Sequence, residues 1–415
     1  MGWLVSILLA GLLAGVVGVG LVALYHVSAT RRIAAKAERL VPPAGRFLDV
    51  GGNRIHYVDT GEGPPILFLH GLGAQLLQFR QHLFGELAGH RLIALDRPGS
   101  GYSVRARDGR PELTEQARLV ARFIEAVGLD RPLLVAHSLG GAVALAVALE
   151  HPGAVRGLAL LSPLTRFVWP PPPEFAALYV PSPLRRRLLG HTTAIPAALK
   201  LAPATLSFLF APREPDPDFM IAGGGWLGLR PSHFEATVAD YTALGVDLPR
   251  LQERYGEIAM PVGILFGTAD AVLDHRVHGL GMQDRIAGLE VELVDNVGHM
   301  THYGAVAQAA ALIGRIAARS GTSGDLAAYL RKGDRVMEGE VKIAPELLHK
   351  GETGARKYSP QPVSSDEQDG ISRGGTDTGD PKDRPPKAGH GLTEKVDEDP
   401  LSTGKSDGTD MPNRT

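Results

Sequence analysis

The sequence predicts an α/β protein with a mostly parallel sheet, helices on both faces of that sheet, a helical cap and an N-terminal transmembrane helix. Through the middle of the chain, short apolar stretches alternate with longer ones whose apolar residues recur at helical spacing. An apolar share of 44% over 415 residues provides for a sizeable core. One long segment interrupts the alternation, and an uncharged run opens the chain.

Residues 1–30 are expected to form a membrane anchor. The stretch from Trp3 to Tyr25 carries no charge over about the length that crosses a bilayer, and an aromatic residue stands at each end. The alternative is a secretory signal cleaved near residues 27–29, which would export the protein, although no basic side chain precedes the apolar run. A basic linker is expected at residues 31–45. Its basic residues are Arg31, Arg32, Lys36 and Arg39. By the positive-inside rule, they place the main domain of a single-pass protein on the cytoplasmic side.

The main domain is expected at residues 46–319, and its elements follow in order. Glycines at 51 and 52 predict a hairpin between strands at 46–50 and 54–59. Apolar runs predict further strands, and helical periodicity predicts helices on the sheet. The strands are expected near 64–71, 90–96, 131–138, 155–163, 261–270 and 289–299, and the helices near 112–127, 139–152 and 303–320.

A helical cap is expected at about 163–255, inserted between two strands. This segment has a proline run at 170–173, followed by apolar helical stretches at 195–210 and 232–244. Its length favours a lid over the end of the sheet rather than an ordinary connection. After the main domain, residues 320–350 form an extension of uncertain structure. Residues 351–415 are rich in Gly, Ser, Thr, Asp, Lys and Pro, which predicts a disordered tail.

Composition narrows the chemistry that this chain can carry. The formal net charge of -2 gives no general attraction to nucleic acid, so no nucleic-acid partner is expected. The chain has no cysteine, which excludes disulfides, thiolate metal sites and a cysteine nucleophile. Serine, histidine and carboxylate side chains remain. We expect no metal and no organic cofactor, and the oligomeric state stays open.

Ser138 lies where a predicted strand turns into a helix without an intervening loop. Such a sharp turn needs small neighbours, and Ala136, Gly140 and Gly141 provide them. The serine side chain would then stand out from the sheet at the start of the helix, and the N–H of Leu139 would point to where an oxyanion forms. The plain alternative is a small residue at a tight turn.

Two other strand ends carry the partners that a serine nucleophile requires. Asp270 follows one strand and His299 follows the last one, so the chain order is Ser, Asp, His. His299 would accept the serine proton, and Asp270 would hold the imidazole in the correct tautomer. The competing residues are Asp274 and Asp295 for the acid and His302 for the base.

The segment His70-Gly71-Leu72-Gly73 follows another predicted strand. Its glycines would let the backbone approach a substrate, and the N–H of Leu72 would be a second oxyanion donor. His70 is expected to be a structural hydrogen-bonding residue rather than a base. His137 precedes the serine and is expected to be structural as well, with its side chain directed away by the turn.

Five segments in this order, HGLG, DRPGSGYS, AHSLGG, GTAD and GHMTHYG, resemble the α/β-hydrolase fold family. The resemblance is to its serine-hydrolase branch with an inserted cap, esterase-like or lipase-like, and covers roughly residues 46–319. It implies an eight-stranded sheet, a triad of Ser138, Asp270 and His299, and an oxyanion hole from Leu72 and Leu139. Ala136 departs from the glycine that is common at that position in the family. Related dehalogenases and epoxide hydrolases carry aspartate as the nucleophile, and Ser138 argues against both.

The expected function is therefore that of a membrane-anchored serine hydrolase. It would cleave a carboxylic ester with an apolar group through an acyl-enzyme, with the bilayer and a small molecule as its partners. Phe208, Phe210 and Trp226 would either line the site or form the core of the lid. The same triad also suits carbon–carbon bond hydrolysis or cofactor-free perhydrolysis. An alternative of another class is a non-catalytic membrane protein that binds an apolar ligand or a partner.

Overall fold

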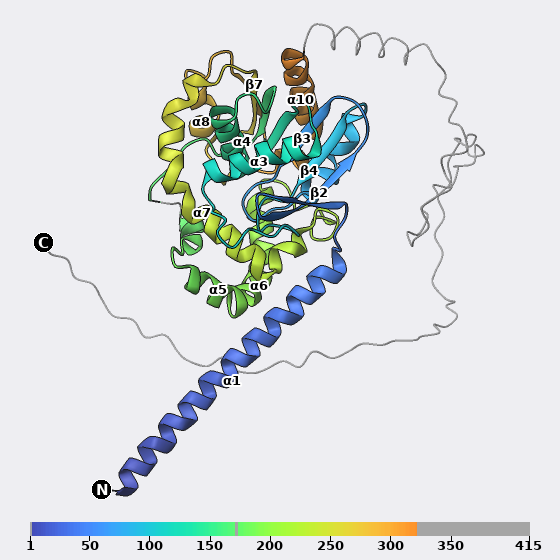
Figure 1. Ribbon diagram of the computed structural model, residues 1–415. Coiled ribbons are helices and arrows are strands. Elements are labelled where there is room, and N and C mark those ends of the chain that lie inside the picture. The colour runs from blue at the N-terminus through green and yellow to red at the C-terminus, as the bar shows by residue number, and fades with distance from the viewer. Residues whose placement is uncertain (1, 171–172, 322–415) are drawn as a thin grey trace, which may run out of the picture. The chain divides into compact units, whose positions relative to one another are not determined.

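The computed structural model describes residues 2–170 and 173–321 (Figure 1). The expected tail at 351–415 lies outside the described residues. So does the expected extension at 320–350, except for its first two residues.

The core of the described chain is an eight-stranded sheet, as the sequence predicts. Its strands are β1 (Arg46–Val50), β2 (Asn53–Thr60), β3 (Pro65–Leu69), β4 (Arg91–Leu95), β5 (Leu133–His137), β6 (Gly157–Leu161), β7 (Val262–Gly267) and β8 (Glu290–Val294). The order across the sheet is β1-β2-β4-β3-β5-β6-β7-β8. β2 runs antiparallel to both of its neighbours, and every other pair is parallel. The mostly parallel sheet is therefore confirmed.

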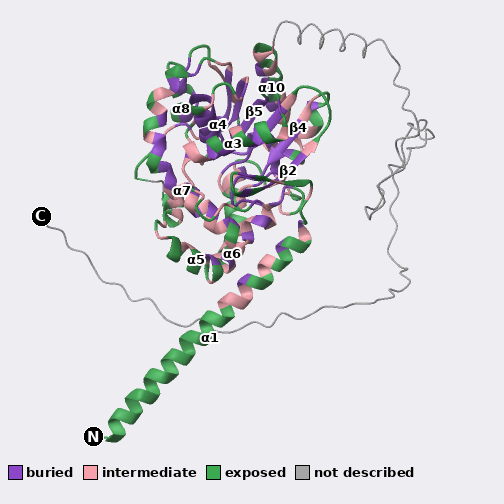
Figure 2. Ribbon diagram, in the orientation of Figure 1, coloured by how far each residue is buried: buried purple, intermediate pink, exposed green. Residues whose placement is uncertain are grey.

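Helices cover both faces of this sheet. They are α2 (Leu77–Arg80), η1 (Leu83–Leu87), α3 (Leu113–Val127), α4 (Leu139–Glu150), α8 (His275–His278), η5 (Leu280–Met282), α9 (Thr301–Gly304) and α10 (Val306–Ser320). Along β5, Leu134 and Ala136 pack with α3 and α4, whereas Leu133 and Val135 pack with α10. Alternate residues of one strand thus serve opposite cores, which explains why the central strands are apolar throughout and buried (Figure 2).

The closing helix differs from its prediction. The sequence predicts one helix at 303–320, but the structure breaks it at Ala305 into α9 and α10. The short helix α9 carries the residues that follow His299, and its Tyr303 packs against Phe210 of the cap segment.

The cap segment consists of helices and turns. Its elements are η2 (Pro173–Leu178), α5 (Pro183–His191), α6 (Ala194–Phe210), η3 (Gly225–Leu229) and α7 (Pro231–Leu251), and η4 (Gln252–Glu257) leads back to β7. α5 begins with a proline after Ser182, whose side chain accepts a hydrogen bond from the Arg185 N–H. α7 also begins with a proline. Proline is favoured at the first position of a helix, so the sequence itself marks both starts.

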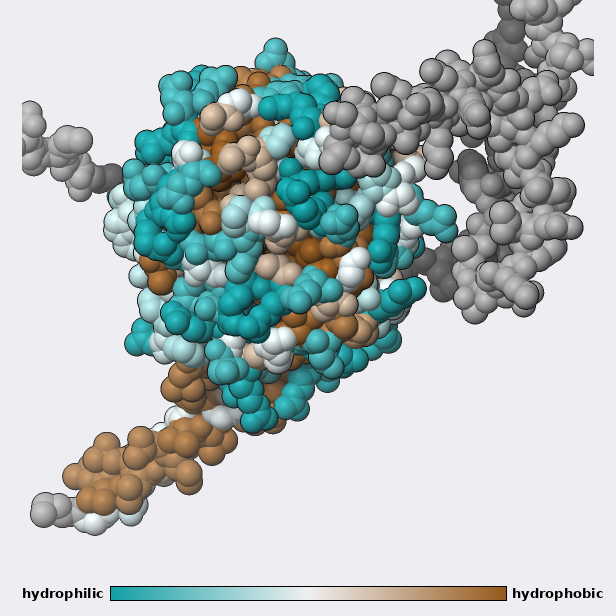
Figure 3. All heavy atoms as spheres, turned by 45° about the horizontal axis from the view of Figure 1, so that its top comes forward, coloured by the Kyte–Doolittle hydropathy of each residue, from teal (hydrophilic) through white to brown (hydrophobic). Residues whose placement is uncertain are grey.

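The N-terminal helix α1 runs without a break from Gly2 to Leu40. Among the described residues, it is the one helix that is long and apolar enough by itself to cross a membrane. Its first two thirds are exposed and apolar, and Figure 3 shows this part as a brown rod that projects from the body.

Residues 31–40 were expected to belong to a linker, and instead they continue α1. Most of them are strong helix formers such as Ala, Arg, Lys, Glu and Leu. Contacts with the cap also hold this end of the helix. Ala37 is fully buried, and the Glu38 carboxylate lies 2.9 Å from the guanidinium of Arg230. The helix is therefore anchored to the body through its last turns.

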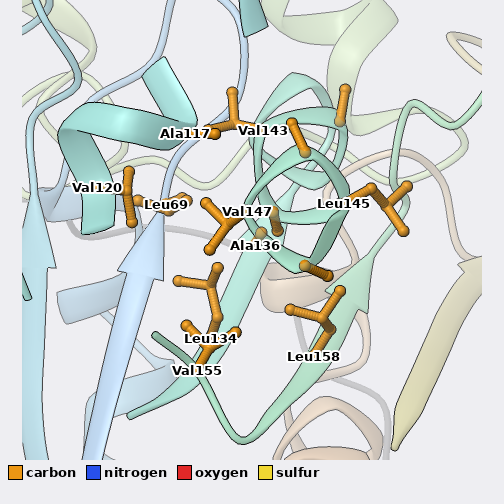
Figure 4. Close-up of a cluster of buried hydrophobic side chains, with 14 of the residues drawn as sticks. Leu69, Ala117, Val120, Leu134, Ala136, Val143, Leu145, Val147, Val155 and Leu158 are labelled. Carbon is orange, nitrogen blue, oxygen red and sulfur yellow. The ribbon is translucent and has the colours of Figure 1, made fainter. Parts of the chain in front are cut away.

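Helix α4 follows β5 directly and is apolar on all sides. Eleven of its twelve residues are alanine, valine, leucine or glycine, and they show no amphipathic pattern because the helix is enclosed by the sheet and by its neighbours. Figure 4 shows Val143 and Val147 of α4 beside Leu134 and Ala136 of β5, with Val120 of α3 at the edge of the cluster. This packing fixes the turn between β5 and α4, where Ser138 lies.

Candidate active site

Ser138 occupies a strained turn between β5 and α4. Its φ of 54° and ψ of -122° lie in a region that a residue with a Cβ rarely adopts. Hydrogen bonds on both sides hold the turn. The Ser138 N–H donates to the Leu161 carbonyl at 3.1 Å, and the Ser138 carbonyl accepts from the N–H groups of Gly141 at 2.8 Å and Leu164 at 2.9 Å. The surrounding backbone thus keeps the side chain raised above the sheet.

The small residues around the turn allow this close packing. A Cβ at Gly140 would lie 2.4 Å from the carbonyl oxygen of Leu69, so α4 can approach β3 only with glycine there. Ala136, the departure from the common family pattern, is fully buried in β5 between β3 and β6. Its methyl group is part of the core on the α4 side of the sheet (Figure 4). The alanine is therefore accommodated by the core and does not prevent the turn.

The structure brings Ser138, His299 and Asp270 together in one chain of hydrogen bonds. His299 Nε2 lies 3.0 Å from Ser138 Oγ, and His299 Nδ1 lies 2.8 Å from Asp270 Oδ2. An ionised carboxylate can only accept, so Nδ1 carries the proton and Nε2 is free to accept the serine hydroxyl. His299 is buried and Ser138 is half-buried, so the serine is the member of the chain that solvent reaches.

Asp270 has the environment of an ionised orienting group. It follows β7 by three residues, and its side chain is fully buried. Its second oxygen, Oδ1, accepts the N–H groups of Val272 at 2.8 Å and Leu273 at 3.0 Å. Burial raises the pKa of Asp270, but the neighbouring His299 and the two backbone N–H groups outweigh burial, so the pKa lies below its usual value.

The competing residues lie elsewhere. Asp274 caps the start of α8, where its half-exposed carboxylate accepts the Arg276 N–H at 2.8 Å. Asp295 is exposed after β8. His302 is fully buried in α9, 4.5 Å from the ring of His137, and burial lowers the pKa of His302 well below its usual value. The ring of His299 instead forms its hydrogen bonds with Asp270 and Ser138.

His137 contacts the backbone of His299, a role that the sequence did not predict. Its Nε2 lies 3.1 Å from the carbonyl oxygen of His299, so the ring joins the end of β5 to the backbone of the proposed base. Burial lowers the pKa of His137 to about 3, which keeps the ring neutral near pH 7. In the sequence, the one sign of this contact is a polar ring at the end of an otherwise apolar strand.

The two backbone segments that carry the expected oxyanion donors both adjoin Ser138. Leu139 is the first residue of α4, and the first N–H groups of a helix have no acceptor within that helix. Gly71, the neighbour of Leu72, packs against the serine, because a Cβ at Gly71 would lie 3.0 Å from the Cβ of Ser138. Both backbone segments therefore border the space in which an oxyanion would form.

Arg97 is a second group that the sequence analysis missed. Its side chain is fully buried and donates to the carbonyl oxygens of His70 at 3.0 Å and Gly71 at 2.9 Å. It also donates to Gln116 at 2.7 Å and to Asp240 of α7 at 2.6 Å. Burial lowers the pKa of Arg97, although a guanidinium remains charged in proteins. Arg97 thus holds the HGLG segment and ties it to the cap; it belongs to the DRPGSGYS segment, to which no role was assigned.

His70 uses both ring nitrogens within the backbone network. Its Nε2 accepts the Arg97 N–H at 2.9 Å, and its Nδ1 lies 2.9 Å from the Gly71 carbonyl oxygen. The ring is fully buried, and burial lowers the pKa of His70 well below its usual value. These contacts support the structural role that the sequence suggested.

The cap meets the His299 segment through glycine and an aromatic cluster. A Cβ at Gly298 would lie 1.7 Å from the carbonyl oxygen of Ala211, the residue after α6. Next to it, Phe210 is buried and packs edge-on against Phe219 and Tyr303, with ring centroids 5.2 Å and 5.3 Å away. The end of α6 therefore packs directly on the segment that carries His299.

The other two expected lining residues differ in position. Phe208 is half-buried in α6. Trp226 lies under the ammonium group of Lys36, 4.8 Å from its ring centroid, so it faces α1. Within the part of the chain that the structure describes, no group of three or more His, Cys, Asp or Glu side chains is placed to hold a metal ion.

Comparisons with known proteins agree with this architecture. The sequence model of the alpha/beta hydrolase fold family matches residues 64–305, more than half of the chain. Haloalkane dehalogenase 2 of Mycobacterium tuberculosis is 37% identical over 122 residues, which are 29% of this chain and 43% of the relative. The chain thus spans less than half the length of that relative.

Two further matches extend over longer stretches. A 2-hydroxy-6-oxononadienedioate/2-hydroxy-6-oxononatrienedioate hydrolase of Klebsiella pneumoniae is 27% identical over 268 residues, 62% of this chain and 90% of the relative. The crystal structure of a membrane phospholipase A, described as a bacterial virulence factor, matches with a TM-score of 0.53 and 23% identity. It covers 75% of this chain and 98% of that chain. At this identity, the match shows a shared fold.

Proposed function

Because the chain belongs to the α/β-hydrolase fold family, we propose that it is a membrane-anchored serine hydrolase of carboxylic esters with an apolar group. The observation that carries this proposal is the chain of hydrogen bonds from Ser138 through His299 to Asp270. Serine is a weak nucleophile unless a base accepts its proton, and here a base and its orienting carboxylate are in place.

In the first half of the proposed reaction, Ser138 Oγ attacks the ester carbonyl carbon while His299 Nε2 takes the hydroxyl proton. The carbonyl oxygen becomes an oxyanion, which the N–H groups of Leu72 and Leu139 would stabilise. His299 then gives the proton to the alcohol oxygen. The bond from carbon to that oxygen breaks, the alcohol leaves and the acyl group stays on Ser138.

In the second half, water replaces the alcohol. His299 takes a proton from water as the water oxygen attacks the acyl carbon. Collapse of the second tetrahedral intermediate returns the proton to Ser138 Oγ and releases the acid. Asp270 stays ionised and stabilises the imidazolium in both halves, which fits the low pKa of this carboxyl group. No step requires a metal or an organic cofactor.

The relatives provide one competing reaction. The Klebsiella hydrolase has a name that indicates a carbon–carbon bond hydrolase, and its similarity extends over most of its length. Such hydrolysis, or perhydrolysis, would use the same serine, histidine and aspartate. The dehalogenase reaction fits less well, because the related dehalogenases use an aspartate where this chain has Ser138. A non-catalytic role would leave the buried hydrogen-bond chain without a purpose.

The membrane anchor is part of the proposal. α1 has the length and apolarity of a bilayer span, and its N-terminal part is exposed in the structure. Arg31, Arg32, Lys36 and Arg39 follow the apolar run and favour a catalytic domain on the cytoplasmic side. Digestion of sealed, right-side-out vesicles with an added protease tests the orientation. Protection of the domain until the vesicles are opened supports it, and cleavage in sealed vesicles contradicts it.

A fluorophosphonate probe tests the proposed nucleophile. The full chain should become labelled, and Ser138→Ala should not, while an unchanged thermal unfolding temperature shows that the variant is folded. Hydrolysis of p-nitrophenyl esters of graded chain length then separates an esterase from a carbon–carbon hydrolase. Absence of labelling in folded wild-type protein would overturn the proposal.

A further inference from the structure

Helix α1 leaves the body of the protein beside the cap helices α5 and α6. The Thr30 hydroxyl donates to the carbonyl oxygen of Thr192 at 2.7 Å, and Thr192 lies between the end of α5 and the start of α6. Residues of α1 on the N-terminal side of this contact become exposed within a few residues. The point where α1 would enter a bilayer is therefore next to α5 and α6 (Figure 1).

Both cap helices expose large apolar side chains at this place. Leu184 and Leu188 stand four residues apart on α5, hence on one side of it, and are 77% and 62% exposed. Leu201 on α6 is 58% exposed. The two helices meet at 74° and together have the apolarity of a membrane segment. Exposed apolar side chains rimmed by polar ones mark a surface that contacts another protein or a membrane.

The charges on the same helices are all basic. Arg185 and Arg187 are exposed on α5, and Lys200 is exposed on α6. Neither helix contains an aspartate or a glutamate. Apolar side chains flanked by cations are typical of a surface that lies in the interface of an anionic bilayer, with leucines among the acyl chains and cations at the phosphates.

We propose that this α5–α6 surface, formed by Leu184, Leu188, Leu201, Arg185, Arg187 and Lys200, rests on the membrane that α1 enters. The inference depends on the proposed membrane anchor and adds a second contact to it. The anchor favours the bilayer as the occupant over another protein, because it keeps lipid next to this surface at all times.

The proposal gives the cap a role in substrate entry. α6 begins at the α5–α6 surface and ends at Phe210, and the next residue, Ala211, packs on Gly298 beside His299. A single helix therefore connects the bilayer contact to the segment that carries the proposed base. An ester dissolved in the membrane would reach the cap before it reaches the active site. Contact with lipid would act on α6, the cap helix whose end packs beside His299.

The absence of cysteine makes the contact measurable by single spin labels. Leu188→Cys and Leu201→Cys report on the surface, Leu12→Cys reports on α1, and Gln308→Cys on α10 is the exposed control. The full-length protein is reconstituted in vesicles of phosphatidylcholine and phosphatidylglycerol. Accessibility to oxygen and to a water-soluble nickel chelate is then measured for each label.

We expect the ratio of oxygen to nickel accessibility at positions 188 and 201 to rise severalfold above that at position 308, towards the ratio at position 12. Water-like ratios at 188 and 201, with a lipid-like ratio at 12, would overturn the surface contact and leave the anchor intact. A water-like ratio at 12 would overturn the anchor and the surface contact together.

A charge variant tests the basic residues separately. Arg185→Gln/Arg187→Gln should lower the ratio at position 188 in vesicles with anionic lipid. The matched control, Arg118→Gln/Arg276→Gln, removes the same charge from exposed positions on α3 and α8 and should leave the ratio unchanged. Equal effects of the two variants would contradict recognition of the anionic surface by α5.

Discussion

At the carboxyl ends of β5 and β7, polar groups are buried and paired within the chain, whereas on α5 and α6 apolar groups are exposed without such partners. The Asp270 carboxylate is fully buried and accepts hydrogen bonds from His299 and from two backbone N–H groups. Leu188 of the cap is 62% exposed. The polar groups of the first region have their partners within the protein, whereas the apolar groups of the second would find theirs in the membrane. Substitutions in the two regions should therefore affect different measurements.

The largest expected effect comes from breaking the buried chain of hydrogen bonds at its end. Asp270→Asn should lower kcat for an ester substrate by about 10⁴-fold, because the amide favours the wrong tautomer of His299. Asp274→Asn, at the nearby half-exposed cap of α8, is the matched control and should change kcat little. Steady-state kinetics of both variants decide the point. A similar loss in the two variants would contradict the assignment of the acid.

The next effect concerns the buried link between the sheet and the cap. Asp240→Asn leaves Arg97, which is fully buried, without its carboxylate, and it also removes the ion pair between Asp240 and Arg105. Loss of one partner of a buried pair should lower the free energy of unfolding by about 3–5 kcal/mol. Urea denaturation measures this value. A change below about 1 kcal/mol would show that the pair does not hold the cap.

A smaller effect is expected where the cap packs on the His299 segment. Gly298→Ala places a methyl group against the Ala211 carbonyl, so the segment must move. Moving the segment that carries His299 by about 1 Å should lower kcat about 10²-fold. Gly314→Ala is the control, because nothing lies near its Cβ in α10, and it should stabilise the protein by about 0.5–1 kcal/mol. Full activity of Gly298→Ala would contradict the close contact.

Buried imidazoles predict a dependence of stability on pH. Burial lowers the pKa of His278 to about 4, so below pH 6.5 the unfolded chain binds a proton that the folded chain does not. The free energy of unfolding should therefore fall as pH falls from about 6.5 to 4, by about 1.4 kcal/mol per pH unit for each such histidine. In His278→Asn, the amide oxygen can still accept the Thr165 N–H, and the slope should decrease by about this amount. An unchanged slope in urea titrations would contradict the assignment.

The smallest expected effect lies on the α5–α6 surface. Leu188→Gln replaces an exposed side chain and should change the free energy of unfolding in detergent by less than about 0.5 kcal/mol. Leu134→Ala, in the fully buried strand β5, should lower it by about 2–5 kcal/mol. Loss of stability in Leu188→Gln comparable with that in Leu134→Ala would show that α5 packs against the protein and not against a partner.

The sheet and the three residues of the candidate site were predictable because local patterns specify them. β5 is a continuous apolar run, and Ser138 directly follows it, so strand, turn and side chain could be located together. Asp270 and His299 do not follow β7 and β8 directly, but each lies in the loop just after the end of its strand. Parallel strands end at one edge, which brings residues distant in sequence to one place.

The remaining features depend on contacts that local patterns do not specify. The guanidinium of Arg97 reaches the HGLG segment and Asp240 of the cap, which lie far from it in the sequence. Gly298 meets Ala211 only because α6 ends there. The basic residues after the apolar run suggested a linker, whereas contacts of Thr30, Lys36 and Glu38 with the cap hold this stretch as part of α1.

The continuity of α1 has a consequence for kinetics. A helix of 39 residues is about 58 Å long, and a bilayer core takes up about 30 Å of that length. With α1 in a membrane, the rest of the helix packs against the cap and holds it at the lipid, so the catalytic domain works within a thin layer above its own bilayer. Its turnover would then follow the mole fraction of ester in that membrane, and diluting the vesicles in buffer would leave the rate per enzyme unchanged.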